Sequence, residues 1–270
     1  MLTLFGNVDS GNVHKVQMIL SRLSLPFRRV EVRQDRGEPR DARFLAINPM
    51  GKVPVVRLSD GDILSDSGAI LFYFSSGTEL WPDVRRDQAE VLRWMFFEQY
   101  SHEPALAVLR YLKRFTPDPD AHQLRINELV SKSAFVLGVL EKRLVEAEWI
   151  AGSAPTIADY ALYPYTHWMD EVGFSHGDWP AISLWLNRIE KLPGFLPLYT
   201  DAATDIIAFA DDFMATACHT QLRDRIPWRD GNQGFAGSVG EASCLRQRKG
   251  RPCCASCLVP SCGGSGRAGE

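Results

Sequence analysis

Cysteine is absent from the first 217 of the 270 residues. All six cysteines lie in the last fifth of the chain, at Cys218, Cys244, Cys253, Cys254, Cys257 and Cys262. The long first part of the chain therefore has no C-x-x-C pair after its first predicted strand, which excludes dithiol exchange by its own side chains. Any thiol chemistry in this part has to use a thiol that a ligand brings.

Long hydrophobic runs and a strong charge of one sign are also missing. No apolar run approaches the about 20 residues that a membrane span needs, and 30 Lys and Arg against 33 Asp and Glu leave a formal net charge of -3. This composition gives no reason to expect nucleic acid or an acidic membrane as a partner. The first residues lack a basic segment followed by an apolar stretch and a cleavage site, so we expect a cytoplasmic protein.

Residues 1–77 alternate between strand and helix patterns. Short apolar or alternating runs predict strands, and runs with a helical period predict helices. In chain order these are a strand at 2–6, a helix at 12–25, a strand at 26–33, a helix at 41–48, two strands joined by a turn at 53–67, and a helix at 67–76. The order predicts a parallel strand pair and an antiparallel hairpin. We therefore expect a small α/β domain, of βαβαββα order, over residues 1–80.

Strand patterns nearly vanish after a linker at 77–86. Long amphipathic runs then predict helices. They lie at 87–115, 121–147, 156–172 and 180–192, with a last short helix within 194–214. Pro104 lies inside the first of these runs, where it predicts a kink. We expect an all-helical domain over residues 87–213.

Residues 222–270 have a different character. Gly, Arg, Ser and Cys are frequent and no apolar period is sustained, so this stretch cannot bury enough apolar surface to offset the entropy lost on ordering. We predict a disordered tail that neither the fold nor any activity needs. A zinc site in its CCASCLVPSC stretch is the less favoured alternative, because no histidine follows at zinc-finger spacing. No metal is expected.

The sequence DSGN joins the first predicted strand to the first predicted helix. Ser and Asn are preferred at helix N-caps and Gly permits a tight turn, so Ser10, Gly11 and Asn12 could serve only to start the helix. The alternative is a functional role, because hydroxyl and amide donors at the positive end of a helix can stabilise an anion. His14, one turn further on, is expected to face solvent rather than to act as a base.

Two further stretches carry groups suited to a ligand. In NPMGKVPVV a loop ends at Val53 and Pro54 and runs into a strand. An ordinary trans proline there is the alternative to a cis bond that leaves the backbone of Val53 open to a peptide ligand. In LSDSGAIL, Asp66 and Ser67 start a helix, where they could cap it or capture the carboxylate and ammonium groups of an amino acid.

Together, and in this order, the motifs make residues 1–210 resemble a glutathione S-transferase of the cytosolic superfamily. SGNVHKV resembles the S-S-C-x-W-R-V and T-P-N-G-x-K openings of its serine- and threonine-type classes. NPMGKVPVV resembles the loop that carries the family's cis-proline, and LSDSGAIL resembles its E-S-x-A-I motif, with Asp66 in place of the more usual Glu. TIAD resembles its capping box, with Thr156 as N-cap and Asp159 at the third helical position. The resemblance implies a thioredoxin-like domain followed by an all-α domain.

The resemblance also implies a glutathione site, residue by residue. It places the hydroxyl of Ser10 at the glutathione sulfur, and Asn12 at a position where other classes carry cysteine or asparagine. The first strand ends in Phe5 and Gly6, so no tyrosine stands at the tyrosine-type catalytic position, which indicates a bacterial serine- or asparagine-site class. The implied glutathione-binding residues are Lys52 near the glutathione backbone or its glycyl end, Val53 and Pro54 at the cysteinyl backbone, and Asp66 and Ser67 at the γ-glutamyl group.

The function that the resemblance implies is that of a glutathione transferase. Ser10 and Asn12 would stabilise the thiolate of glutathione, a co-substrate, for attack on a small electrophile or for reduction of peroxides or disulfides. Tyr100, Glu103 and Trp168 are the expected residues of the electrophile pocket. The resemblance also implies a homodimer. The alternative is a non-catalytic relative that serves as a binding or scaffold protein.

Overall fold

The computed structural model describes residues 1–212, and its first part is built on a mixed sheet. The strands are β1 (Leu2–Gly6), β2 (Phe27–Glu31), β3 (Val55–Arg57), β4 (Ile63–Ser65) and β5 (Asp205–Ala208), in the spatial order β4-β3-β1-β2-β5. β1 is parallel to β2 and antiparallel to β3, and β3 and β4 form an antiparallel hairpin. The predicted parallel pair and hairpin are confirmed.

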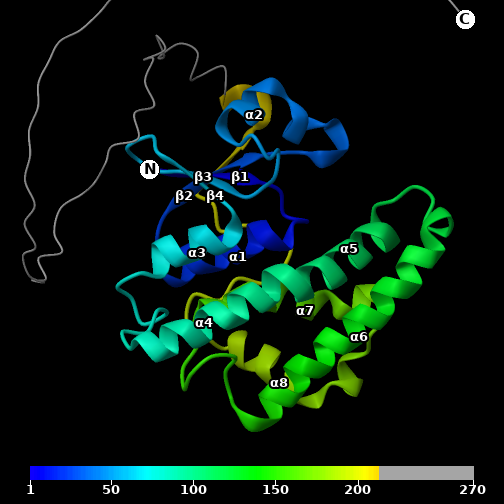
Figure 1. Ribbon diagram of the computed structural model, residues 1–270. Coiled ribbons are helices and arrows are strands. Elements are labelled where there is room, and N and C mark those ends of the chain that lie inside the picture. The colour runs from blue at the N-terminus through cyan, green and yellow to red at the C-terminus, as the bar shows by residue number, and fades with distance from the viewer. Residues whose placement is uncertain (213–270) are drawn as a thin grey trace, which may run out of the picture. The chain divides into compact units, whose positions relative to one another are not determined.

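Helices cover both faces of this sheet. They are α1 (Gly11–Arg22), α2 (Ala42–Ile47) and α3 (Ser67–Ser75). α1 and α3 lie on the face toward the helical part of the molecule, and α2 lies on the opposite face (Figure 1). Leu4 of β1 joins the core that includes α1 and α3, whereas its neighbour Phe5 packs with Phe44 of α2. The two cores separate in this way because successive strand side chains point to opposite faces.

The second part of the chain is helical. Its helices are α4 (Arg85–Phe97), α5 (Glu103–Arg114), α6 (Gln123–Glu146), α7 (Ile157–His167) and α8 (Pro180–Ile189). α7 contacts α1, α3 and α4, so it joins the helical part to the sheet domain. The predicted capping box starts α7, with the Thr156 N–H donating to the Asp159 carboxylate at 2.8 Å. The predicted fold class, a thioredoxin-like α/β domain followed by an all-α domain, is confirmed.

The long helix predicted over 87–115 is interrupted. A π-helical segment, Glu98–His102, separates α4 from α5, and Pro104 lies in the first turn of α5. Proline has no N–H to donate, and its ring collides with the carbonyl four residues earlier, here that of Tyr100. The wider π-helical turn accommodates this conflict just before the proline. A π-helical segment therefore lies where the sequence predicts a kink.

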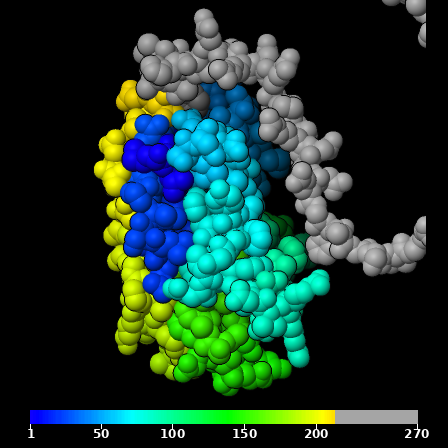
Figure 2. Space-filling view, turned by 90° about the vertical axis from the view of Figure 1, so that its left-hand side faces the viewer, coloured from blue at the N-terminus to red at the C-terminus, as the bar shows by residue number. Residues whose placement is uncertain are grey.

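The segment expected to hold a last short helix first contributes a strand. β5 pairs in parallel with β2, and Thr204 donates its N–H to the carbonyl of Phe27 at 2.8 Å. Figure 2 shows this yellow segment beside the blue N-terminal residues. Helical residues follow only at 209–212. The four residues of β5, DIIA, have no polar–apolar alternation, and the strand forms because the edge of β2 offers backbone groups to pair with.

Some predictions stay untested by the fold. Those for the tail at 222–270 lie outside the described residues, and the boundaries at residues 80 and 87 stay predictions. Within residues 1–212, no helix is both long enough and apolar enough to cross a membrane. The same part of the chain holds no group of three or more His, Cys, Asp or Glu side chains arranged to bind a metal ion.

Candidate functional site

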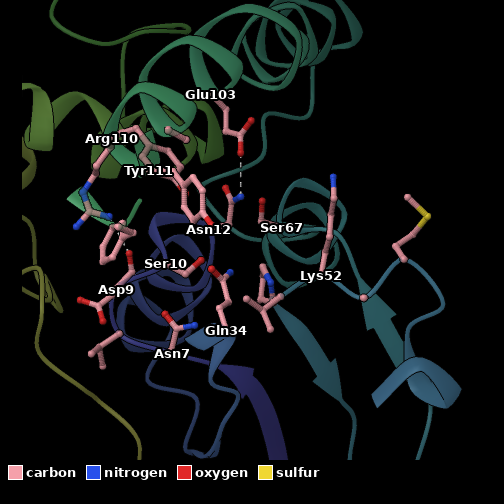
Figure 3. A pocket seen from close by; sticks show the side chains of 18 of the residues that line it. Asn7, Asp9, Ser10, Asn12, Gln34, Lys52, Ser67, Glu103, Arg110 and Tyr111 are labelled. Atoms are coloured by element: carbon pink, nitrogen blue, oxygen red, sulfur yellow. Dashed lines mark hydrogen bonds between the residues drawn. The ribbon is translucent and has the colours of Figure 1, made fainter. Parts of the chain in front are cut away.

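A cavity of about 990 Å³ lies between the sheet domain and the helical part. Its wall is formed by the turn after β1, the end of β2 with the residues that follow it, the loop before β3, the start of α3, one side of α5 and Tyr165 of α7 (Figure 3). The fold thus brings residues from six separate stretches to one place. Every residue predicted to activate or bind glutathione lines the cavity, namely Ser10, Asn12, Lys52, Val53, Pro54, Asp66 and Ser67.

Ser10 occupies the N-cap of α1. Its Oγ accepts a hydrogen bond from the backbone N–H of Val13 at 3.3 Å, so capping is one of its roles. A hydroxyl can accept and donate at the same time, and no acceptor for the Ser10 hydroxyl proton is found among residues 1–212. This proton is therefore available to a ligand in the cavity, at the positive end of a helix.

Asn12 lies in the first turn of α1, with its side-chain amide between two ionisable groups. Its Oδ1 accepts a hydrogen bond from Nζ of Lys15 at 2.7 Å. Its Nδ2 donates to Oε1 of Glu103, on α5, at 3.4 Å (Figure 3). An amide nitrogen carries two hydrogens, so one remains for a ligand.

The loop before β3 is held in shape by the side chain of Asn48. Its Nδ2 donates to the carbonyl of Lys52 at 2.7 Å, and its Oδ1 accepts from the N–H of Met50 at 3.2 Å. The Val53–Pro54 peptide bond is cis, as predicted. No hydrogen bond to the backbone of Val53 is found within the described residues, and the Lys52 side chain is exposed. Polar groups of both residues are therefore free for a ligand.

Asp66 is the N-cap of α3 and lies in the left-handed region, with a φ of 73°. Its Oδ1 accepts from the N–H groups of Gly68 and Ala69 at 2.9 and 3.2 Å, so it does cap the helix. Within residues 1–212 no partner is found for its Oδ2 or for the N–H of Ser67, the first residue of α3. A ligand that carries both an ammonium and a carboxylate group can bind this pair.

The structure brings one of the three residues predicted for the electrophile pocket into the cavity. Glu103 lines the cavity, but Tyr100 and Trp168 do not. Tyr100 is 88% exposed because the π-helical segment changes the helical phase at this point. Trp168 is buried, with the guanidinium of Arg110 at 3.8 Å from its ring centroid. The aromatic side chains that do line the cavity are Tyr111, Phe115 and Tyr165.

Arg110 is a site residue that the sequence did not reveal. Its buried guanidinium donates to the carboxylate of Glu171 at 2.5 Å and to the hydroxyl of Tyr199 at 2.8 Å. It also donates to the backbone carbonyl of Asp9 at 2.9 Å. These partners lie 61, 89 and 101 residues away in the sequence, so no local pattern could have shown them.

His14 is buried, which corrects the expectation that it faces solvent. Its Nε2 lies 3.1 Å from the carbonyl oxygen of Leu196. A carbonyl only accepts, so Nε2 carries the proton. Burial lowers the pKa of His14 to about 4. His14 is therefore a neutral group that fastens the segment after α8 to α1, and it does not line the cavity.

Family models match both parts of this architecture. The model for the N-terminal domain of glutathione S-transferase matches residues 9–76, and the model for its C-terminal domain matches residues 103–193. Glutathione S-transferase GstB from Escherichia coli is 30% identical over 198 residues, which cover 72% of this chain and 95% of that protein.

Solved structures agree with these matches. The crystal structure of a glutathione S-transferase from Pseudomonas fluorescens has a TM-score of 0.72 and 37% identity, and covers 74% of this chain and 99% of its own. The yeast prion protein Ure2p, solved in complex with glutathione, has a TM-score of 0.66 and 26% identity, and covers 72% of this chain and 95% of its own. Because both domain models match in the order in which the fold arranges them, this chain belongs to the glutathione S-transferase family.

Proposed function

We propose that this protein is a glutathione transferase of the bacterial serine/asparagine-site class, which activates the glutathione thiol for attack on small electrophiles. One observation carries the proposal. Two free hydrogen-bond donors on the first turn of α1 share a cavity with free groups that suit the two ends and the middle of glutathione. The chemistry of that tripeptide matches this cavity group by group.

Glutathione carries an ammonium and a carboxylate at its γ-glutamyl end, a peptide group at its centre and a second carboxylate at its glycyl end. Asp66 Oδ2 and the Ser67 N–H suit the γ-glutamyl end, at the start of α3. The free backbone of Val53 suits the central peptide, as in the addition of a strand. The exposed ammonium of Lys52 suits the glycyl carboxylate. The similarity to Ure2p in complex with glutathione supports the same ligand.

The donors near the sulfur supply the activation. A free thiol titrates near pH 8.5, so only a few per cent is thiolate at neutral pH. Lowering this pKa by about two units takes about 2.7 kcal/mol of differential stabilisation. The Ser10 hydroxyl, the Asn12 amide and the positive end of α1 can share this stabilisation. Ser10 then acts as a hydrogen-bond donor and not as a nucleophile.

The co-substrate lies against α5 in this proposal. Ala107, Val108, Tyr111 and Phe115 give this side of the cavity an apolar and aromatic wall, which suits a small apolar electrophile. In conjugation, the thiolate sulfur bonds to the electrophilic atom and the leaving group departs with its electron pair. With a peroxide or a disulfide as the second substrate, two glutathione molecules are instead oxidised to their disulfide, while their two electrons and two protons reduce a hydroperoxide to an alcohol and water, or a disulfide to two thiols.

The test combines binding and turnover. Calorimetry with glutathione should show binding to the purified protein. Conjugation should be assayed with chlorodinitrobenzene, and reduction with a hydroperoxide and a small disulfide. Ser10→Ala and Asn12→Ala should each raise the pKa of the bound thiol by about one unit and lower kcat about tenfold below neutral pH. Ser175→Ala, at a serine N-cap outside the cavity, and Asn187→Ala, on exposed α8 surface, are the matched controls.

Each outcome has a meaning. Ser10→Gly, which costs a helix cap only a few tenths of a kcal/mol, separates loss of the hydroxyl from loss of the cap. Unchanged pH–rate profiles in the Ser10 and Asn12 variants would remove both residues from the thiolate. Glutathione binding without turnover of any substrate would favour the alternative, a non-catalytic binding or scaffold protein. No binding would refute the proposal.

A further inference from the structure

A buried ion pair lies beside Asn12, just outside the cavity wall. Lys15, on α1, is 1% exposed, and Glu98, in the π-helical segment, is 3% exposed. Lys15 Nζ and Glu98 Oε1 are 2.5 Å apart. Neither residue lines the cavity. Taking two charges out of water is costly, so the role of this pair is to be sought in what it contacts.

Lys15 decides which end of the Asn12 amide faces which way. Oxygen and nitrogen of an amide are assigned from their partners, and an ammonium group only donates hydrogen bonds. The end of Asn12 that meets Lys15 Nζ at 2.7 Å must therefore be the oxygen. The opposite end, toward Glu103 and the cavity, must be the NH2 group. Glu103 is an acceptor and is compatible with the same orientation, but its contact, at 3.4 Å, is much longer than that of Lys15.

The surroundings of Lys15 offer no other cation to do this. Across from it lie the ring of Tyr165 on α7, at 5.4 Å from Nζ, and His102 of the π-helical segment. The pKa of His102 is lowered to about 3, first by burial and then by the charge of Lys15, so His102 is neutral. Glu98, Glu103 and, at the start of α3, Asp66 are the acidic groups in the neighbourhood. Within the described residues, Lys15 is thus the donor that holds Oδ1.

We propose that Lys15 is a positioning residue that acts through Asn12, turning the amide so that N–H and not oxygen faces the sulfur of glutathione. The proposal rests on the proposed function. An amide turned by half a rotation would present its oxygen, whose partial negative charge opposes a thiolate. Glu98 contributes by compensating the positive charge of Lys15, so that the ammonium group can stay buried beside Asn12.

The first test removes the ion pair as a unit. Lys15→Met combined with Glu98→Leu leaves no unpaired buried charge, and such replacements are often neutral for stability. The thermal unfolding midpoint should stay close to that of the wild type. The pKa of the bound glutathione thiol should rise by about one unit and kcat should fall about tenfold. The KM for glutathione should change less than about threefold. Lys132→Met with Glu128→Leu, which removes an exposed ion pair on α6, is the matched control.

The second test asks whether Lys15 acts through Asn12. In the Asn12→Ala background, removing the ion pair should cause no further change in kcat or in the thiol pKa, because the group that Lys15 orients is already gone. Two effects that multiply would show that Lys15 acts independently of Asn12, and would overturn the proposal. An unchanged thiol pKa in the folded Lys15→Met, Glu98→Leu protein would also overturn it.

A third measurement needs neither a ligand nor a variant. In NMR spectra of the wild-type protein, the side-chain amide protons of Asn12 should show NOEs to the methylene protons of Glu103. NOEs from these protons to the ε-methylene of Lys15 instead would overturn the proposal. If the wild type binds no glutathione, the proposed function fails, and this measurement still decides the orientation of Asn12.

Discussion

The guanidinium of Arg110, on α5, donates a hydrogen bond of 2.9 Å to the backbone carbonyl of Asp9, the residue directly before Ser10. The same guanidinium is paired with Glu171 at 2.5 Å and lies over the ring of Trp168. Through Arg110, the helical part of the chain therefore holds in place the turn after β1, in which Ser10 lines the cavity.

Arg110→Met should loosen this turn. We expect kcat to fall about tenfold, because a small displacement of a catalytic donor is costly. The free energy of unfolding should fall by about 3 kcal/mol, because Glu171 loses its buried partner. Arg114→Met is the control, since Arg114 contacts the same Glu171 at 3.1 Å from a half-exposed position. Equal kcat values for the two variants would contradict a role for the Asp9 contact.

Asp66→Asn should separate binding from capping at α3. An Asn side chain can still accept from the N–H groups of Gly68 and Ala69, but it lacks the negative charge that the γ-glutamyl ammonium needs. Calorimetry should show a Kd for glutathione at least about tenfold weaker, because charge-assisted hydrogen bonds contribute about 1.5–3 kcal/mol. Asp41→Asn, at the N-cap of α2 and outside the cavity, should leave the Kd unchanged. Equal affinity of the two variants would exclude Asp66 from the γ-glutamyl site.

Gly11→Ala should destabilise the start of α1. A Cβ at Gly11 would lie 2.6 Å from Cζ of Tyr165, so the ring would have to move. We expect the free energy of unfolding in urea to fall by about 1–3 kcal/mol. Gly138→Ala, on α6, meets nothing in the described part of the chain within 4 Å and should be neutral or stabilising by up to about 1 kcal/mol. If the Gly11→Ala protein is as stable as the Gly138→Ala protein, the ring of Tyr165 moves aside without a loss of stability, and the prediction is wrong.

His14 should make the protein less stable in mild acid. Its pKa is about 4 in the folded state against an ordinary value of 6.5, so the unfolded state binds a proton first as the pH falls. The contribution of neutral His14 to the free energy of unfolding is fully present above about pH 6.5. It is lost as the pH falls toward about 4, by up to about 3 kcal/mol. The His14→Gln protein lacks this loss. Urea unfolding at several pH values should therefore show that its free energy of unfolding depends less on pH than that of the wild type. His122→Gln, at an exposed position, is the control and should show the pH dependence of the wild type. The prediction is contradicted if the free energy of unfolding of His14→Gln falls with pH as steeply as that of the wild type.

A two-fold homodimer is expected from the resemblance, in which the third helix of one subunit meets the fourth and fifth of the other. Large apolar side chains such as Phe72 of α3 and Phe96 of α4 are exposed. Sedimentation at micromolar concentration should show a dimer for the wild type and a monomer for Phe96→Glu, which would place a charge in the expected interface. Leu184→Glu, on α8, is the control and should stay dimeric. Leu184 is 65% exposed, which is close to the 67% of Phe96. A wild-type monomer would contradict the expectation.

Features that depend on residues close in sequence could be predicted from the sequence alone. The Ser10 cap, the Asp66 cap and the Thr156–Asp159 capping box each join groups two or three residues apart. The β3–β4 hairpin likewise follows from a short turn between two strand patterns. These interactions form wherever the local residues are present, so a sequence pattern is enough to indicate them.

Only the tertiary structure decided which distant groups complete the site. Lys15 meets Glu98 across 83 residues, and Arg110 meets Asp9 across 101. A lysine or an arginine on a helix is ordinarily solvated, and nothing local indicates that either will be buried. β5 pairs with β2 although its four residues have no strand pattern, and the π-helical segment turns Tyr100 out of the predicted pocket. Long-range contacts of this kind depend on which surfaces the whole fold removes from water, and that is settled only when the sheet domain and the helical part have packed together.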